Sequence, residues 1–245
     1  MESWRDTGIV LSVRSHGENG AVVSLLTETM GRHAGYIRGM GSSKLRGVIE
    51  PGNLVSAAWS SRVSDGLGTF ELEPARAIAA PLMGDALRLG ALISACSLCD
   101  AALPEREVHA GIFNGLLALL DHLDGPAWGP AYVMWEIAFM RELGFGLDFT
   151  RCAGGGDAKT LAYISPKSGC TVSAEKAEPY KDKLLALPDF LKPGGSSTET
   201  DDIIKGLLLT GYFLEHWVFA QHTKGVPEPR LRFQERVERQ SAAAA

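Results

Sequence analysis

The sequence has 245 residues, of which 45% are hydrophobic and 22% are charged, and its net charge is −5. This composition is that of a globular protein and excludes a disordered chain. The negative net charge excludes a protein whose whole surface is positively charged, so any binding site for a polyanion must be local. The sequence contains no run of about 18 uncharged apolar residues and no apolar core of a signal peptide, so we expect no membrane span and a cytoplasmic location.

The first 80 residues alternate short runs rich in β-branched and aromatic residues with turn sequences, which is typical of strands. Five strands are predicted, at residues 8–14, 21–27, 35–40, 53–59 and 69–78. No helical period separates these runs. Because closure of a small sheet removes its exposed edges, the sequence predicts a five-stranded β-barrel over residues 1–80.

After Pro81 the apolar residues recur at helical spacing, which predicts an α-helical bundle over residues 81–245 and an α+β fold for the chain. The helices are expected around residues 89–103, 105–123, 128–143, 174–186 and 199–222. Residues 145–173 break this period with glycines, a short strand-like run and turn residues. This segment is therefore predicted to be a compact irregular insert.

Residues 32–47, RHAGYIRGMGSSKLRG, form a basic segment without any acid in an otherwise acidic chain. A small barrel can bind single-stranded nucleic acid by combining a positive groove with aromatic stacking platforms. Tyr36 lies in this segment, and Trp4, Trp59 and Phe70 belong to the same domain. A solvated loop with scattered charges explains the same residues equally well. A phosphate-binding loop of an enzyme would require glycine motifs that the segment lacks.

Two of the four cysteines, Cys96 and Cys99, have the spacing of metal ligands but fall on an apolar helical stripe. No second pair lies near them in the sequence. A buried cysteine is a common small core residue, so both are predicted to pack in the core.

The other two cysteines, Cys152 and Cys170, flank the irregular insert. A structural zinc site would require a second cysteine three residues after each of them, to complete four thiolate ligands. Gly155 and Ser173 occupy these two positions. Asp157 could supply a third ligand, although the spacing does not require it. An insert held by packing without a metal ion is the favoured interpretation.

The sequence contains no motif of a known catalytic site. Its six histidines are scattered, and neither HExxH nor GxSxG occurs. Glu71 and Glu73 share one face of a predicted strand, which is a weak indication of a metal site. A metal-dependent hydrolase acting on nucleic acid therefore ranks last among the functions considered.

Three segments, taken in order, resemble the bacterial DNA repair protein RecO family of recombination mediators. They are WRDTGIVLSVR followed by HGENGAVV, then TETMGRHAGYIRGMGSSK, and then ELGFGLDFTRCAGGG. The resemblance covers nearly the whole chain. It implies an N-terminal OB-fold, a helical domain and, in some members, a four-cysteine zinc knuckle. Cys152 and Cys170 fall at knuckle positions, but two of the four cysteines are replaced, so the knuckle is degenerate and no cofactor is expected.

The resemblance also implies a function without catalysis. Members of the family bind single- and double-stranded DNA, anneal complementary strands and act with the partner RecR. They also engage the C-terminal tail of single-stranded DNA-binding protein and help to load the recombinase onto coated strands. The alternative is a protein–protein scaffold that docks acidic peptide tails and has only incidental affinity for DNA.

The resemblance places the functional residues in two regions of this chain. Arg141, in the helical domain, is the candidate contact for the acidic tail. The expected DNA-binding residues lie in the barrel: Arg14, Arg32, Tyr36, Arg38, Lys44 and Arg46.

Overall fold

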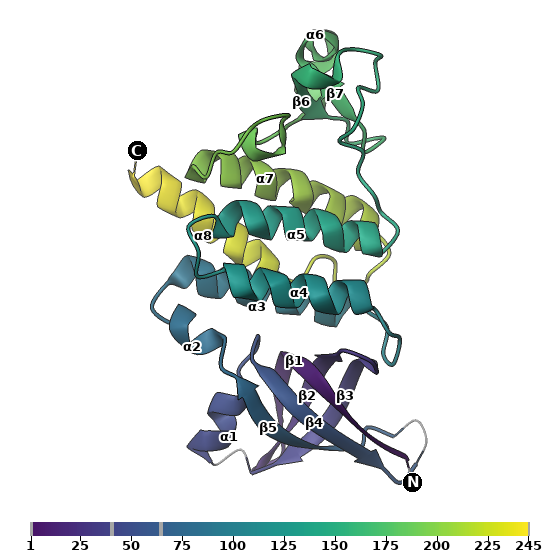
Figure 1. Cartoon of the computed structure of the whole chain (residues 1–245), viewed down its shortest axis with the longest axis vertical. Helices are drawn as coiled ribbons and strands as arrows, with labels where there is room; N and C mark the ends of the chain where they lie inside the picture. Colours follow the sequence, from purple (N-terminus) through teal and green to yellow (C-terminus); the bar gives the residue numbers. More distant parts are fainter. Residues whose placement is uncertain (1, 40–41, 64–65, 245) are drawn as a thin grey trace. The chain divides into compact units, whose positions relative to one another are not determined.

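The computed structural model describes residues 2–39, 42–63 and 66–244, without the side chains of Lys44 and Ala244 (Figure 1). The chain divides into two compact units. One comprises Met1–Asp124 with Pro227–Arg230, and the other comprises Gly125–Val226 with Leu231–Ala245. The predicted division at residue 80 stays a prediction. Among the described residues, no helix has both the length and the apolar character needed to cross a bilayer.

The N-terminal part of the first unit is a closed five-stranded barrel with the order β1-β2-β3-β5-β4. Its neighbouring strands are antiparallel except for β3 and β5, which are joined in parallel at the pair Tyr36 and Thr69. Helix α1 (Ser43–Val48) lies between β3 and β4 in the sequence. The barrel followed by helices confirms the predicted fold class, an OB-fold barrel with a helical region. The strands are β1 (Glu2–His16), β2 (Gly20–Thr27), β3 (Gly31–Arg38), β4 (Leu54–Ser61) and β5 (Thr69–Arg76).

The barrel interior contains most of the aromatic residues that were candidates for stacking on the bases of a nucleic acid. Trp59 is 1% exposed and Phe70 is 5% exposed, and Trp4 stacks on Trp59 with 5.8 Å between the ring centroids. Gly35 makes room for this packing, because a Cβ atom there would lie 2.4 Å from the Phe70 ring. These rings therefore stabilise the core by burying apolar area, and Trp59 and Phe70 do not present an open face to solvent.

A buried histidine, His33, lies among these rings and is 3% exposed. Its ring meets Trp4 and Trp59 edge-on, with centroid distances of 4.9 and 4.7 Å. Burial lowers the pKa of His33, and the positive charge of Arg106 lowers it further, although Glu105 acts in the opposite direction. The folded barrel therefore favours the neutral imidazole.

This environment predicts that the barrel loses stability in mild acid. The unfolded chain takes up a proton on His33 near the ordinary pKa of 6.5. In the folded chain the pKa of His33 is lower, so protonation requires a lower pH. Below that pH the unfolded state binds more protons, so the free energy of unfolding falls by up to about 1.4 kcal/mol per pH unit. Urea titrations at several pH values measure this slope. His33→Phe should reduce it, and an equal slope in this variant and the unmodified protein would contradict the prediction.

Three helices complete the first unit: α2 (Ala79–Leu82), α3 (Ala86–Ala102) and α4 (Ala110–His122). Asp85 caps α3, because its carboxylate accepts hydrogen bonds from the N–H groups of Leu87 and Arg88. Cys96 and Cys99 are fully buried in α3, as the apolar stripe predicted. The helix expected from residue 105 begins only at Ala110, after a left-handed backbone at Arg106 with φ 63°.

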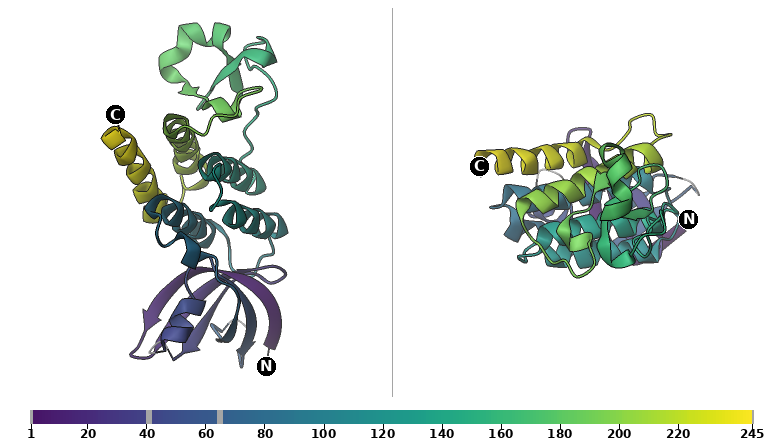
Figure 2. Two further views of the ribbon diagram at one scale, coloured as in Figure 1. Left: turned by 60° about the vertical axis from the view of Figure 1, so that its left-hand side comes forward. Right: turned by 90° about the horizontal axis from the view of Figure 1, so that it is seen from above.

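Helix α3 is anchored to the barrel through one carboxylate. It packs against β1 and β2 (Figure 2), and Asp100 near its end accepts hydrogen bonds from Ser12 Oγ at 2.8 Å and Ser24 Oγ at 2.6 Å. Arg32 of β3 reaches the same carboxylate, with its Nη1 atom 3.4 Å from Oδ1. Three strands and one helix thus share a single charged acceptor.

The second unit is built around α5 (Trp128–Glu142) and α7 (Thr200–Phe213), which lie side by side (Figures 1 and 2). Glu136 is fully buried between them and accepts hydrogen bonds from Tyr132 Oη and Thr210 Oγ1. The predicted helix over residues 199–222 is shorter, because α7 passes into a π-helical turn, η4 (Leu214–Val218). Helix α8 (Glu228–Ala244) was not predicted, because charged residues dominate its sequence.

Two strands of the irregular insert, β6 and β7, belong to a three-stranded sheet of order β7-β6-β8, whose third strand lies beyond the insert. The helix predicted over residues 174–186 is wrong: only one α-helical turn forms. Pro179 lacks the N–H group that a continuing α-helix needs, and the chain passes through a 3₁₀ segment into a strand. The elements are η1 (Ala158–Thr160), β6 (Leu161–Ile164), β7 (Thr171–Ser173), α6 (Ala174–Ala177), η2 (Glu178–Lys183), β8 (Leu185–Ala186) and η3 (Asp189–Leu191).

Candidate nucleic-acid interface

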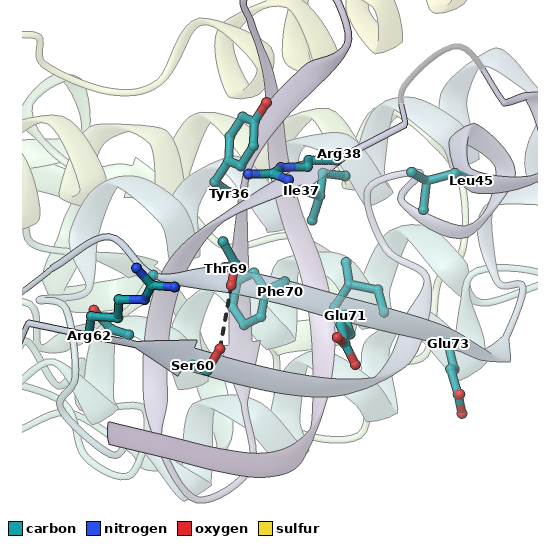
Figure 3. A pocket seen from close by; sticks show the side chains of 13 residues that line it. Tyr36, Ile37, Arg38, Leu45, Ser60, Arg62, Thr69, Phe70, Glu71 and Glu73 are labelled. Carbon is teal, nitrogen blue, oxygen red and sulfur yellow. Dashed lines mark hydrogen bonds between the residues drawn. The ribbon is translucent and has the colours of Figure 1, made fainter. Parts of the chain in front are cut away.

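A groove of about 1100 Å³ opens on the barrel surface between β3 and β5 (Figure 3). These strands are paired at Tyr36 and Thr69, and no further pair joins them in the described chain. They therefore separate beyond this point. Leu45 of α1 lines the groove as well, and the helix contacts β5. The barrel topology thus creates the groove where its parallel strand pair ends.

Strand alternation decides which side chains face the groove. On β3, Tyr36 and Arg38 point outward, whereas Ile37 between them is only 3% exposed. On β5, Glu71 and Glu73 are exposed and Phe70 is buried. The groove therefore has polar and charged walls. Its apolar lining comes from Ile37, Leu45, Phe70 and Leu72.

Two arginines line the groove and a third lies next to it. Arg38 extends from the end of β3, and Arg62 follows the last residue of β4 (Figure 3). Arg46 is exposed on α1, directly after the lining residue Leu45. Within the described chain, none of these three guanidinium groups has a carboxylate within salt-bridge distance. Their charge is therefore available to an anionic ligand.

Tyr36 is the aromatic side chain that remains partly exposed in the groove. Its ring meets His16 edge-on, with 5.9 Å between centroids, and it lies over Gly20 of β2. A Cβ atom at Gly20 would be 2.0 Å from the Tyr36 hydroxyl. The glycine therefore sets the position of the ring beside Arg38.

The structure brings together only part of the predicted set of DNA-binding residues. Tyr36 and Arg38 line the groove and Arg46 adjoins it. Arg14 is exposed on β1 but is not among the lining residues. The side chain of Lys44 lies outside the described part of the chain.

Arg32 has a different environment from the other predicted contacts. Its side chain is 17% exposed, and its Nη1 atom lies 3.4 Å from Asp100 and 3.5 Å from Glu105. Its Nε atom donates to the carbonyl oxygen of Leu103 at 2.7 Å. This guanidinium is satisfied within the fold, so it links β3 to the end of α3.

Arg62 is not among the predicted contacts, because its segment, SRVSDGLG, has the composition of a turn. Ser60 pairs with Thr69 in the β4–β5 hairpin, and Ser60 Oγ lies 3.4 Å from Thr69 Oγ1. Arg62 is two residues beyond Ser60, which places it on the same side of the chain as the groove. The register of the hairpin was the signal that could have identified it.

The cysteines of the insert lie in the second unit. Cys152 is 8% exposed, and its sulfur accepts a hydrogen bond from the Ser173 N–H at 3.2 Å and donates to the Ser173 hydroxyl at 3.5 Å. Burial raises the pKa of this thiol, but the hydrogen bonds from Ser173 and from the backbone of Gly156 and Gly154 outweigh it and lower the pKa to about 7. Cys170 is half-buried.

This donor set does not suit a structural zinc ion. In the described chain, no three His, Cys, Asp or Glu side chains are grouped so that they could hold a metal, whereas structural zinc takes four such ligands. Ser173, which stands where a four-thiolate site would need a cysteine, accepts a hydrogen bond from the Cys152 thiol through its hydroxyl. Asp157 instead caps η1, where its carboxylate accepts from the Lys159 N–H at 2.9 Å.

Comparison with known proteins identifies the family of this barrel and helical region. Residues 1–77 match the family described as Recombination protein O N terminal, and residues 83–224 match Recombination protein O C terminal. The DNA repair protein RecO of Rhodospirillum centenum is 51% identical over 235 residues, covering 95% of this chain and 94% of the relative. That of Rhodospirillum rubrum is 44% identical over 250 residues, covering 99% of each. The chain therefore belongs to the recombination protein O family.

Proposed function

We propose that this protein is a non-enzymatic recombination mediator in DNA repair, and that it contacts DNA through the groove between β3 and β5. Family membership supports the role in DNA repair. One observation supports the location: Arg38 and Arg62, which have no carboxylate partner among the described residues, flank a partly exposed Tyr36 beside an apolar lining. A positive groove with an aromatic ring is the combination that holds a single strand in barrels of this kind.

The mechanism is electrostatic and needs no bond to be made or broken. The guanidinium groups neutralise phosphates and release counterions, while bases stack on Tyr36 and on the apolar lining. When two complementary strands are held on such a surface, their mutual repulsion is screened and they can pair. The protein thereby binds single- and double-stranded DNA and anneals complementary strands without a metal ion or other cofactor.

A salt titration of the unmodified protein tests this proposal. The logarithm of the affinity for a single-stranded oligonucleotide should fall with the logarithm of the salt concentration, by about 0.7 for each phosphate contacted. Annealing of complementary strands should weaken over the same range of salt. An affinity that is undetectable at low salt would overturn the proposal and favour the scaffold alternative.

The helical region supplies the protein contacts in this proposal. Arg141, exposed in the last turn of α5, contacts the acidic C-terminal tail of single-stranded DNA-binding protein. The protein acts with RecR and helps to load the recombinase onto coated strands. Arg141→Ala should weaken binding of an acidic peptide that ends in apolar residues but leave DNA affinity unchanged. Equal peptide affinity in both proteins would reject Arg141 as the contact.

The position of Tyr36 gives a separate prediction for DNA affinity. In Gly20→Ala the new methyl group would meet the Tyr36 ring, so the ring must move away from Arg38. The loss of stacking on one base should cost about 1–3 kcal/mol of binding free energy, similar to the loss in Tyr36→Ala. Fluorescence titration with a labelled single strand measures both. If the losses of binding free energy in Gly20→Ala and Tyr36→Ala add up in the variant that combines them, the two substitutions do not act through the same ring and the prediction is wrong.

A further inference from the structure

The two walls of the groove carry opposite charges. Tyr36 and Arg38 form the β3 wall, whereas Glu71 and Glu73 lie along the outer face of β5 (Figure 3). Both carboxylates are exposed, and neither is paired with a lysine or an arginine in the described chain. A surface evolved only to attract phosphate would not place two uncompensated carboxylates in its own groove.

This arrangement determines how a single strand can lie in the groove. Phosphates are attracted by Arg38 and by Arg62, which follows β4, and are repelled by the carboxylates on β5. The sugar–phosphate chain therefore passes the two arginines and avoids the outer face of β5. The bases then extend across Leu45 and Leu72, which are partly exposed in the groove. Their hydrogen-bonding edges reach the wall formed by Glu71 and Glu73.

Carboxylates at base edges distinguish between bases. An ionised carboxylate only accepts hydrogen bonds. Cytosine, adenine and guanine present an exocyclic amino group that can donate to it, as in the recognition of cytosine N4 by Glu or Asp. Thymine has no amino group, and its carbonyl oxygens flank its one N–H donor and are repelled by the carboxylate.

We propose that Glu71 and Glu73 are specificity-determining residues of the groove, which favour single strands whose bases carry exocyclic amino groups and disfavour thymine. This inference rests on the proposed function of the groove as the DNA contact. Phosphate contacts and stacking do not depend on base identity, whereas these two carboxylates favour bases that can donate a hydrogen bond.

The test compares oligonucleotides of deoxycytidine and of thymidine, about 16 nucleotides long, at neutral pH. Both are pyrimidines, so they differ little in stacking area and not in charge. The unmodified full-length protein should bind the cytidine strand about fivefold more tightly. In the double variant Glu71→Gln with Glu73→Gln the ratio should approach one, chiefly because thymidine binding improves.

A matched variant controls for the change in net charge. Glu18→Gln with Glu28→Gln removes two exposed carboxylates that do not line the groove, so its cytidine preference should equal that of the unmodified protein. Because all four carboxylates are exposed, neither variant should change the unfolding midpoint.

The possible results separate this inference from the proposed function. Equal, salt-dependent binding of both strands by the unmodified protein would overturn the inference and leave the DNA-binding function standing. A gain in the Glu71 and Glu73 variant that is the same for both strands would also overturn it, because the carboxylates would then act only by repelling phosphate. No salt-dependent binding of either strand would overturn both.

Discussion

The combined variant Arg38→Ala, Arg46→Ala and Arg62→Ala should lose about 100-fold or more of its affinity for single-stranded DNA at low salt. Each of these guanidinium groups is expected to neutralise one phosphate, so the salt slope should decrease by about 2, at about 0.7 per contact. The fold should persist, because these side chains are exposed and have no carboxylate partner in the described chain. Fluorescence anisotropy at several salt concentrations measures both quantities.

A control of equal charge comes from the second unit. Lys159, Lys167 and Lys183 are exposed there, and their combined replacement by Ala changes the net charge by the same amount. This variant should keep nearly the full salt slope, because the general attraction of the protein for DNA changes little compared with direct phosphate contacts. If both triple variants lose affinity equally, the groove is not the DNA contact.

Arg32→Ala should have the opposite pattern, a large loss of stability with an unchanged salt slope. The substitution removes the hydrogen bond to the Leu103 carbonyl and the contacts with Asp100 and Glu105. Hydrogen bonds to a charged group contribute about 1.5–3 kcal/mol each, and Asp100 would lose its positively charged neighbour. We expect the free energy of unfolding to fall by about 2–3 kcal/mol, measured by urea titration.

A comparison with Arg38→Ala separates the two roles of neighbouring arginines on one strand. Arg38 is exposed and unpaired in the described chain, so its loss should leave the unfolding midpoint nearly unchanged and reduce DNA affinity. A reduced salt slope in Arg32→Ala at full stability would show that Arg32 contacts DNA, contrary to the expectation from its environment.

The same contrast shows why sequence could suggest part of the interface and not all of it. Tyr36 and Arg38 are two residues apart on β3, a spacing that puts both on one face of a strand. The sequence could not distinguish Arg32 from Arg38, since the partners of Arg32 lie at the end of α3 and just after it, about 70 residues further along the chain. Arg62 was missed because its place in the groove depends on the register between two strands.

Local patterns by themselves determined the five strands, the change to helices near residue 80 and the burial of Cys96 and Cys99, because side-chain periodicity encodes which face of an element is buried. Only the tertiary structure decided that β3 and β5 meet at a single pair and then separate into a groove with a basic and an acidic wall. It also placed the charged helix α8, which buries Phe233 and Val237. Such features depend on contacts between residues distant in the chain, and local propensity carries no information about those contacts.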